Sequence, residues 1–286
     1  MSLKIWLDGK LVEKNEAKIS VYDHGLLYGD GVFEGIRVYA GRVFELDAHL
    51  DRLFASAKAI RLEIPLPREK FRAAIEQTFK ANSFTDCYIR AVVTRGEGSL
   101  GIDPKKCHDP SVFIIADLIA VYPKEMYEKG MAVITASVMR NHPNALSPRV
   151  KSLNYLNNIL ARIEANDAGV PEAVMLNHLG NVSECTADNI FIVRDGQVQT
   201  PGTADGILEG VTRRVMIALC QEQKIPCEEK TLQRHDLYIA DEMFVTGTGA
   251  EVMPVTKIDG RTIGTGQVGA ITQKLTQAFH RHVRDV

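Results

Sequence analysis

The stretch Pro148–Tyr155, with the sequence PRVKSLNY, decides how this chain is interpreted, together with the pair Ser183–Glu184 about thirty residues later. Lys151 lies where an apolar, strand-like run over Met131–Met139 gives way to a helical pattern, so we predict that its side chain projects from a rigid corner. A lysine in a partly buried pocket can condense with an aldehyde cofactor. A carboxylate such as Glu184 against a pyridine nitrogen keeps that ring protonated and able to accept electrons. Lysines are nearly always surface residues, so only the combination predicts chemistry.

The composition predicts a soluble globular protein in a reducing compartment. A chain of 286 residues with 45% apolar residues can form one large or two modest domains with a real core. A net charge of −2 gives no field for nucleic acid or an anionic membrane, so small anions need a local positive pocket. The five cysteines form no CxxC pair, and we find neither an apolar membrane span nor a signal peptide. We therefore expect a cytoplasmic protein without a metal site.

The first third of the chain predicts strands and hairpins around two helices. Asp8–Gly9 and Ala40–Gly41 are turn signals between apolar alternations. Asp47 is predicted to cap the first helix. The expected elements are a hairpin of 32–39 with 42–46, helices over 47–60 and 67–81, and strands over 87–94 and 111–119.

The second half predicts another mixture of strands and helices, which indicates two α+β domains. We place an N-terminal domain at 1–122, a linker at 123–130 and a larger domain at 131–286. A helix after Lys151 carries Leu153, Leu156, Ile159, Leu160 and Ile163 at helical spacing and stops at Gly169. The other expected elements are strands near 132–138, 173–176, 189–193 and 242–245, and helices over 210–224 and 267–283.

Two glycine-containing segments could bind a phosphate. Gly210-Val211-Thr212 at a helix start offers backbone amides, a hydroxyl and the positive end of the helix dipole. Thr246–Gly249 follows a strand and could approach an anion closely. Considered alone, the first segment is more often an ordinary helix cap.

The chain resembles the class IV, fold-type IV aminotransferases that use pyridoxal 5′-phosphate (PLP), and within them the branched-chain-amino-acid aminotransferases. The resemblance extends over essentially the whole chain, in the family's order of motifs. The matching stretches are 5–9, HGLLYGDGVFEGIR at 24–37, HLDRL at 49–53, YIR at 88–90, the Lys151 segment, Ser183–Glu184, LEGVTR at 208–213 and TGTGAE at 246–251.

The resemblance implies an α+β, two-domain enzyme with a small α/β N-terminal domain, a larger domain with a β-barrel-like core, and the cofactor at the domain interface. Lys151 would be the catalytic residue. Arg52, which by pattern alone would be a solvated helix residue, would bind the PLP phosphate through its planar fork. Glu184 would contact the pyridine nitrogen. Tyr155, which would share a helix face with Lys151, would contact the phenolic oxygen, although some family members have an extra residue between the two. The remaining cofactor-binding residues would be Leu208, Gly210, Val211, Thr212 and Thr248.

The resemblance also implies a pocket for two kinds of substrate. Tyr88 and Arg90 point to the same side of a strand, where a solvated sheet face is the more common outcome. By resemblance, Arg90 takes the distal carboxylate of glutamate or 2-oxoglutarate and Tyr88 helps with the α-carboxylate. Thr248, Gly249 and Ala250 would offer backbone amides to that α-carboxylate. The apolar side would comprise Phe33 with Leu100 and Ile102 on a loop from the neighbouring subunit, and Tyr28 and Gly35 complete the set.

The activity implied is PLP-dependent transfer of the amino group from L-leucine, L-isoleucine or L-valine to 2-oxoglutarate by a homodimer or higher oligomer. The main alternative is the family's D-amino-acid transaminase, which carries an Arg-x-His carboxylate trap where this chain has Leu100 and Ile102. Aminodeoxychorismate lyase of the same family is a weaker alternative, since it does not usually show the pair of motifs Tyr-x-Arg and Gly-Val-Phe-Glu-Gly-Ile-Arg. A non-catalytic binder would be expected to lose Lys151 or Glu184, and this chain has both.

Overall fold

The segment that carries Lys151 belongs to the N-terminal part of the fold, although it lies in the middle of the sequence. The computed structural model describes residues 3–120 and 122–285. Unit 1 comprises Met1–Ile119 with Val150–Asn154, and unit 2 comprises Ala120–Arg149 with Tyr155–Val286. The segment 123–130, which the sequence suggests as a linker, contains a helix of unit 2.

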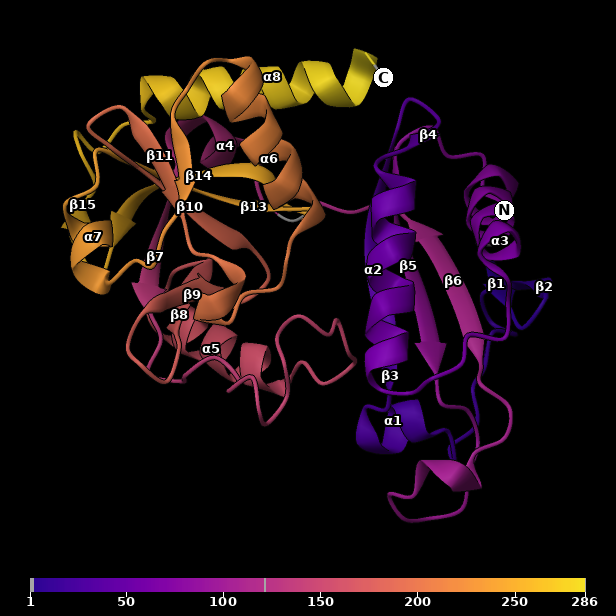
Figure 1. The fold of residues 1–286 in the computed structure, drawn as a ribbon. Coiled ribbons are helices and arrows are strands. Elements are labelled where there is room, and N and C mark those ends of the chain that lie inside the picture. Colours follow the sequence, from indigo (N-terminus) through magenta and orange to yellow (C-terminus); the bar gives the residue numbers. More distant parts are fainter. Residues whose placement is uncertain (1–2, 121, 286) are drawn as a thin grey trace. The chain divides into compact units, whose positions relative to one another are not determined.

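Unit 1 contains one antiparallel sheet and two long helices that cover one of its faces. In the described residues the sheet has six strands, in the order β2-β1-β6-β5-β3-β4 (Figure 1). The elements are β1 (Lys4–Leu7), β2 (Lys10–Glu13), α1 (His24–Tyr28), β3 (Gly31–Tyr39), β4 (Arg42–Val43), α2 (Leu46–Ala59), α3 (Arg68–Ala81), β5 (Cys87–Thr94), a 3-10 turn (Pro104–Lys106) and β6 (Val112–Asp117).

Strand alternation places the side chains of this sheet on two faces. The core face packs against α2 and α3, and the opposite face, which neither helix covers, is called the open face. Val32, Ile36 and Val38 of β3 are buried in the same core as residues of α2 and α3. Phe33 and Gly35 alternate with them and therefore lie on the opposite face. Gly35 pairs with Arg90 of β5, so these residues share the open face. The antiparallel register thus brings the predicted substrate residues together.

The predicted strand β5 and helix α3 are confirmed, whereas the predicted start of α2 is wrong. Helix α2 begins at Leu46, and its N-cap is Glu45, which has φ 47° and makes no side-chain capping bond. Asp47 lies in the first turn, where its carboxylate accepts hydrogen bonds from Arg68 and Arg72 of α3. Asp47 therefore forms long-range ion pairs instead of a local helix cap. The strand β4 is also shorter than the strand predicted over 42–46.

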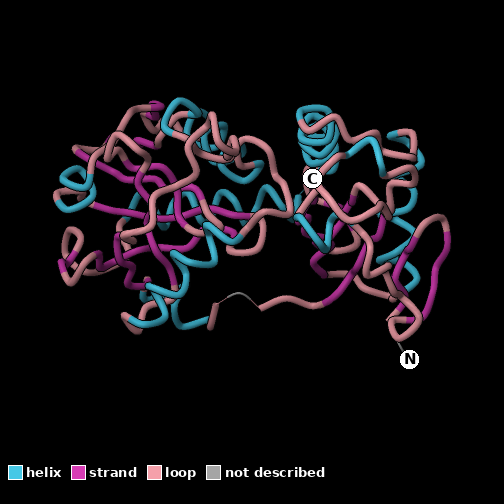
Figure 2. The backbone as a smooth tube through the Cα atoms, turned by 90° about the horizontal axis from the view of Figure 1, so that it is seen from below, coloured by secondary structure: helices cyan, strands magenta, loops and turns pink. Residues whose placement is uncertain are grey.

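Unit 2 contains a nine-stranded mixed sheet in its described residues, with the order β12-β11-β10-β13-β14-β7-β8-β9 and β15 paired to β14. The sheet curls until β9 contacts β10, which agrees with the predicted barrel-like core. Helices lie around the strands of this unit (Figure 2). Its elements are α4 (Lys124–Lys129), β7 (Met131–Thr135), α5 (Leu156–Asp167), β8 (Glu172–Leu176), β9 (Val182–Cys185), β10 (Asn189–Arg194), β11 (Gln197–Thr200), a 3-10 turn (Thr203–Asp205), α6 (Val211–Glu222), β12 (Cys227–Glu229), α7 (Arg234–Tyr238), β13 (Glu242–Gly247), β14 (Glu251–Ile258), β15 (Arg261–Thr262) and α8 (Ala270–Asp285).

Helix α5 corrects the expectation that Lys151 and Tyr155 share a helix face. The helix begins at Leu156 with Tyr155 as its N-cap, so Lys151 lies outside it, in backbone without regular secondary structure. The buried positions of α5 are Asn158, Ala161 and Ala165. The predicted apolar residues of this helix are exposed instead, namely Leu156, Ile159, Leu160 and Ile163.

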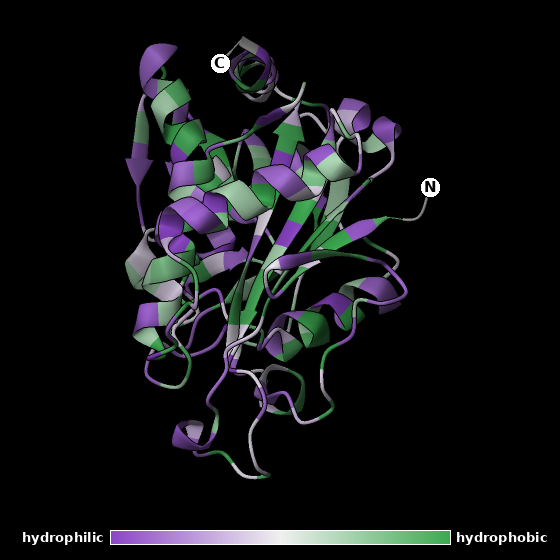
Figure 3. Ribbon diagram, turned by 90° about the vertical axis from the view of Figure 1, so that its right-hand side faces the viewer, coloured by the Kyte–Doolittle hydropathy of each residue, from purple (hydrophilic) through white to green (hydrophobic). Residues whose placement is uncertain are grey.

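The hydropathy colouring follows the sheets, whose strands are mainly hydrophobic, while the helices alternate between polar and apolar faces (Figure 3). Within residues 3–120 and 122–285, no helix combines the length and the apolar composition that a membrane crossing requires.

Candidate active site

The residues expected to carry the chemistry divide between the two units. Unit 1 holds Lys151, Arg52, Tyr28, Phe33, Gly35, Tyr88, Arg90, Leu100 and Ile102. Unit 2 holds Tyr155, Glu184, Leu208, Gly210, Val211, Thr212, Thr248, Gly249 and Ala250.

Lys151 is held by backbone hydrogen bonds to the start of β3. Its carbonyl accepts from the Phe33 N–H at 3.0 Å, and the Leu153 N–H donates to the Gly31 carbonyl at 2.9 Å. The Lys151 N–H donates to Oγ of Ser56 in α2 at 3.1 Å. Its Nζ lies 4.7 Å from the centroid of the Phe33 ring. A rigid strand edge, rather than a helix, therefore places this amine beside the open face of the sheet.

Arg52 is clamped by a buried carboxylate that the sequence had not identified. Its Nε donates to Oε1 of Glu34 at 2.7 Å and its Nη2 donates to Oε2 at 2.8 Å. Nδ1 of His49 lies 2.8 Å from the same Oε2. Burial raises the pKa of Glu34, but Arg52 and then His49 outweigh it and lower that pKa to about 2. Arg52 is therefore an oriented, largely buried cation, not the solvated residue that its pattern suggests.

The sequence pattern could have identified Glu34 as a buried charge that needs a partner. Glu34 lies on the core face of β3 between Val32 and Ile36, and a charged residue there must find a partner. His49 and Arg52 lie three residues apart on α2, so they share the helix face that packs against β3.

Arg90 lies against two aromatic rings on the open face of the sheet. Its guanidinium carbon is 4.4 Å from the Phe33 ring centroid and 5.6 Å from that of Tyr88, and Nη2 donates to Tyr88 Oη at 3.3 Å. A Cβ at Gly35 would lie 1.9 Å from this Oη. Only glycine at position 35 therefore leaves room for the tyrosine hydroxyl.

The other predicted substrate residues of unit 1 lie near the loop after β5. Tyr28 Oη accepts from the Gly101 N–H at 2.9 Å, which ties α1 to this loop. The neighbouring side chains of Leu100 and Ile102 are exposed, at 69% and 84%. Large apolar side chains so exposed are available to a second chain.

In unit 2, Glu184 on β9 forms the centre of a buried polar network. Its Oε1 accepts from Arg140 Nε at 2.8 Å, and its Oε2 accepts from the Leu208 N–H at 2.8 Å and from Asn189 Nδ2 at 3.3 Å. Leu208 therefore contributes its backbone to orienting Glu184. Asn189 Oδ1 lies 2.0 Å from where a Cβ of Gly210 would be, which requires glycine there. The sequence had assigned no role to Arg140 or Asn189.

The start of α6 has the properties of an anion site. Gly210 is the N-cap and makes no side-chain capping bond, so the first amides of this twelve-residue helix retain their positive dipole end. Among the described residues, Oγ1 of Thr212 and Oγ1 of Thr246 are buried and have no hydrogen-bond partner. Buried hydroxyls without partners are rare, and a phosphate would satisfy them. Thr246, near the end of β13, adds to the predicted residues, which named Thr248 in the turn that follows this strand.

A buried pair of carboxylates, Asp188 and Glu172, lies near the end of β13. Oδ1 of Asp188 occupies the space next to Gly247, 1.9 Å from where a Cβ would be placed. Burial and then the neighbouring Glu172 raise the pKa of Asp188 to about 8, while Arg162 acts in the opposite direction. Burial also raises the pKa of Glu172. The folded protein therefore favours the protonated form of Asp188.

Asp188→Asn should make the protein more resistant to alkaline unfolding than the wild type. The pKa of Asp188 is raised on folding, so its stabilising contribution is complete below about pH 4 and is lost as the pH rises toward 8. Asparagine stays neutral, so the difference in unfolding free energy should grow in its favour by at least about 1 kcal/mol between pH 6 and pH 9. Urea unfolding across this range measures the difference. A constant difference would contradict the raised pKa.

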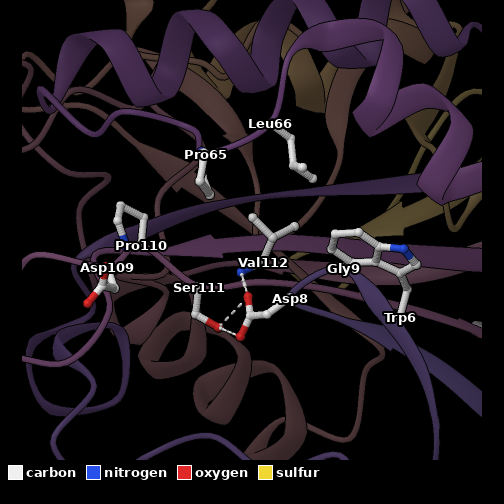
Figure 4. Close-up of a pocket in the computed structure, with 9 residues that line it drawn as sticks. All are labelled: Trp6, Asp8, Gly9, Pro65, Leu66, Asp109, Pro110, Ser111 and Val112. Atoms are coloured by element: carbon white, nitrogen blue, oxygen red, sulfur yellow. Dashed lines mark hydrogen bonds between the residues drawn. The ribbon is translucent and has the colours of Figure 1, made fainter.

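A cavity of about 380 Å³ in unit 1 contains none of the predicted residues (Figure 4). Asp8 accepts from the Val112 N–H at 2.7 Å and from Ser111 Oγ at 2.9 Å, so its carboxylate stabilises the turn after β1. The cavity is lined by Trp6, Asp8, Gly9, Pro65, Leu66, Asp109, Pro110, Ser111 and Val112. In the described part of the chain, no group of three or more His, Cys, Asp or Glu side chains could hold a metal ion.

Comparison with known proteins identifies the family of this chain. Residues 31–258 match the family model described as amino-transferase class IV. A Methanocaldococcus jannaschii relative, assigned as a branched-chain-amino-acid aminotransferase, is 52% identical over 97% of this chain and 95% of its own. The chain is also similar to the branched-chain aminotransferase of the archaeon Thermoproteus uzoniensis, crystallised with norvaline, with 42% identity, a TM-score of 0.93 and coverage of 99% and 95% of the two chains.

A third comparison concerns the T.th. branched-chain amino acid aminotransferase, whose crystal structure contains N-(5′-phosphopyridoxyl)-L-glutamate. It is 36% identical to this chain, with a TM-score of 0.94 and coverage of 100% and 95% of the two chains. These matches confirm the predicted two-domain α+β fold with its curled sheet.

Proposed function

The chain belongs to the class IV aminotransferases and, within them, to the branched-chain-amino-acid aminotransferases, and on this premise we propose that it transfers the amino group of L-leucine, L-isoleucine or L-valine to 2-oxoglutarate. It is a PLP-dependent enzyme, as its family is. The single observation that best supports the substrate pair is Arg90, which lies against Phe33 on the open sheet face. The T.th. relative binds a pyridoxyl derivative of glutamate, and the T. uzoniensis relative binds norvaline.

The residues present fit PLP. In our proposal Arg52, the uncapped start of α6 and the buried hydroxyls of Thr212 and Thr246 hold the phosphate. The backbone of Gly210, Val211 and Thr248 completes this cradle, and Tyr155 contacts the phenolic oxygen. Leu208 serves the cofactor indirectly, because its N–H holds Glu184. When bound, PLP supplies an electron sink for the electron pair released at the substrate α-carbon.

Glu184 contributes a fixed carboxylate, which we assign to the pyridine nitrogen. Arg140 and the Leu208 amide hold both of its oxygens in place, so no reorganisation is needed during the reaction. Lys151 anchors the cofactor, and its Nζ then takes the proton from the substrate α-carbon and later returns a proton, acting first as base and then as acid.

Phe33 and Arg90 together let one pocket accept both substrate classes. A branched hydrocarbon can pack on the Phe33 ring while the guanidinium stays paired with the aromatic faces and Tyr88 Oη. A glutamate side chain instead offers a carboxylate, which binds a guanidinium more strongly than a ring does. We assign the α-carboxylate to Tyr88 and to the backbone of Thr248, Gly249 and Ala250.

Arg90→Met should separate the two half-reactions. Loss of a carboxylate–arginine contact costs roughly 1.5–3 kcal/mol. The second-order rate constants of the half-reactions with glutamate and 2-oxoglutarate should therefore fall about tenfold to a hundredfold. The half-reaction with L-leucine should change much less, because leucine has no distal charge. Single-turnover absorbance changes with each amino acid measure both. Equal losses would remove the distal role, and faster reaction with D-alanine than with L-leucine would favour the D-amino-acid alternative.

We also propose a homodimer or higher homo-oligomer in the cytoplasm. Leu156, Ile159, Leu160 and Ile163 form an exposed apolar stripe on α5, and an unpaired stripe of this kind fits contact with a second copy. Free thiols at all five cysteines support a reducing compartment. Light scattering should give at least twice the monomer mass, and Ile159→Glu should shift the protein toward monomer. A monomeric wild type at micromolar concentration would contradict the oligomer.

A further inference from the structure

We propose that Glu34 and His49 are positioning residues, which hold the Arg52 guanidinium in the orientation in which it binds the cofactor phosphate. The inference rests on the proposed function, because it gives Arg52 the phosphate as its ligand. Neither Glu34 nor His49 needs to touch the cofactor.

The geometry restricts Arg52 to one orientation. Both oxygens of Glu34 are bound by one edge of the guanidinium, through Nε at 2.7 Å and Nη2 at 2.8 Å. Two parallel hydrogen bonds to a planar fork fix its plane as well as its place. Glu34 is fully buried on the rigid strand β3, so the carboxylate itself cannot swing away. An arginine held in this way loses little side-chain entropy when an anion arrives.

His49 supports the carboxylate as a neutral donor. Burial lowers the pKa of His49, and Arg52 and Lys151 act in the same direction, while Glu34 alone raises it. Its Nδ1, 2.8 Å from Glu34 Oε2, therefore carries the proton, and the group of three side chains has no net charge. Nε2 of His49 is buried without a partner among the described residues. Such an unsatisfied atom costs stability, which indicates that this histidine is not optimised for the core alone.

Stability alone does not explain this arrangement. An apolar residue at position 34 would complete the core face formed by Val32, Ile36 and Val38. Buried ion pairs are often no more stable than well-packed apolar groups of similar size. Glu34 also partly neutralises Arg52, so it weakens the simple attraction between this cation and a phosphate. Glu34 instead fixes the orientation of the guanidinium. A role in orientation and a role through charge therefore predict different effects of Glu34 variants on PLP binding.

Unit 1 offers a matched control in the pair Asp30–Arg95. Arg95 donates to both oxygens of Asp30, at 3.0 and 2.9 Å, and also binds the carbonyls of Ile60 and Arg61. This second bidentate pair ties loops of the same unit together. It has no part in the proposed site, so Asp30→Asn measures the general cost of breaking such a pair.

The test compares the binding of PLP, pyridoxal and inorganic phosphate to the apo-protein of each variant. Glu34→Gln and Glu34→Asp should each weaken PLP and phosphate binding about tenfold or more and leave pyridoxal binding within about twofold. His49→Leu should weaken PLP binding about threefold to tenfold, whereas His49→Asn, whose amide can replace Nδ1–H, should stay near wild type. Asp30→Asn should lower the unfolding midpoint without changing the ratio of PLP to pyridoxal affinity.

Several outcomes would overturn the inference. If charge alone mattered, Glu34→Gln would bind PLP more tightly than the wild type, because it leaves Arg52 fully positive. Equal losses for pyridoxal and PLP would reduce Glu34 to a structural role. His49→Leu and Glu34→Asp create no uncompensated charge, so they decide the question if Glu34→Gln does not fold. A wild-type apo-protein that binds pyridoxal but gains no affinity from the phosphate would refute the positioning role alone, whereas one that binds neither compound would refute the proposed function as well.

Discussion

Lys151→Ala is expected to reduce transamination by about 10⁴-fold or more, because one amine both anchors the cofactor and moves the substrate proton. The backbone of Lys151 is tied to Phe33 and Ser56, so the truncation should leave the fold of the segment intact. Steady-state rates with L-leucine and 2-oxoglutarate measure the loss. Lys151→Arg is the matched control: it keeps a cation beside the Phe33 ring, but a guanidinium does not give up its proton. It should be about as inactive as the alanine variant.

Borohydride treatment of the wild type gives an independent test of the same residue. Reduction should attach the pyridoxyl group covalently to Lys151, and peptide mapping by mass spectrometry would locate it. Attachment to another lysine, or a Lys151→Ala enzyme with more than about a tenth of the wild-type rate, would remove Lys151 from the chemistry.

Glu184→Gln should keep the cofactor but lose about 10²–10³-fold in turnover, since a neutral amide cannot hold the pyridine nitrogen protonated. Arg140 would also lose its carboxylate partner, so part of the effect should appear as a lower unfolding midpoint. Glu172→Gln is the control for the general effect of replacing a buried carboxylate in this sheet. Glu172 is another buried glutamate of the same sheet, and it accepts backbone hydrogen bonds from Ala173 and Thr186.

The two variants separate catalysis from folding. Both variants replace a buried carboxylate of this sheet by an amide, but only Glu184→Gln should lose most of its turnover number at saturating PLP. Near wild-type turnover in Glu184→Gln would rule out the electron-sink role for this carboxylate. A comparable loss in Glu172→Gln would mean that any disturbance of this sheet impairs the enzyme.

Local sequence patterns were sufficient to predict helices and strands whose formation depends mainly on neighbouring residues. The helix over 68–81, the strand over 87–94 and the helix that starts after Gly210 follow from periodicity and terminal residues, and all three are confirmed. The family is also contained in the sequence, since its motifs are separated along the chain but occur in a defined order. Fold class, cofactor and reaction type followed from that order and are confirmed by the comparisons.

Tertiary structure decided what depends on residues far apart in the chain. The helical pattern after Lys151 suggested that this residue shares a helix with Tyr155. Hydrogen bonds to β3 and to Ser56, 95 residues away, hold it outside that helix instead. The same holds for Asp47, whose carboxylate binds α3 instead of capping its own helix.

The partners of the charged residues were equally inaccessible to local reasoning. A sequence pattern shows that Glu34 falls on the core face of its strand and that Arg52 lies on a helix. Only the packing of β3 against α2 shows that they form one buried pair. Arg140 comes beside Glu184 because its N–H binds the Leu176 carbonyl of β8, the strand that pairs with β9. The sequence by itself determined the residue types, their order and the local elements. The tertiary structure decided their partners, because hydrogen bonds and ion pairs depend on distance in space rather than on distance along the chain.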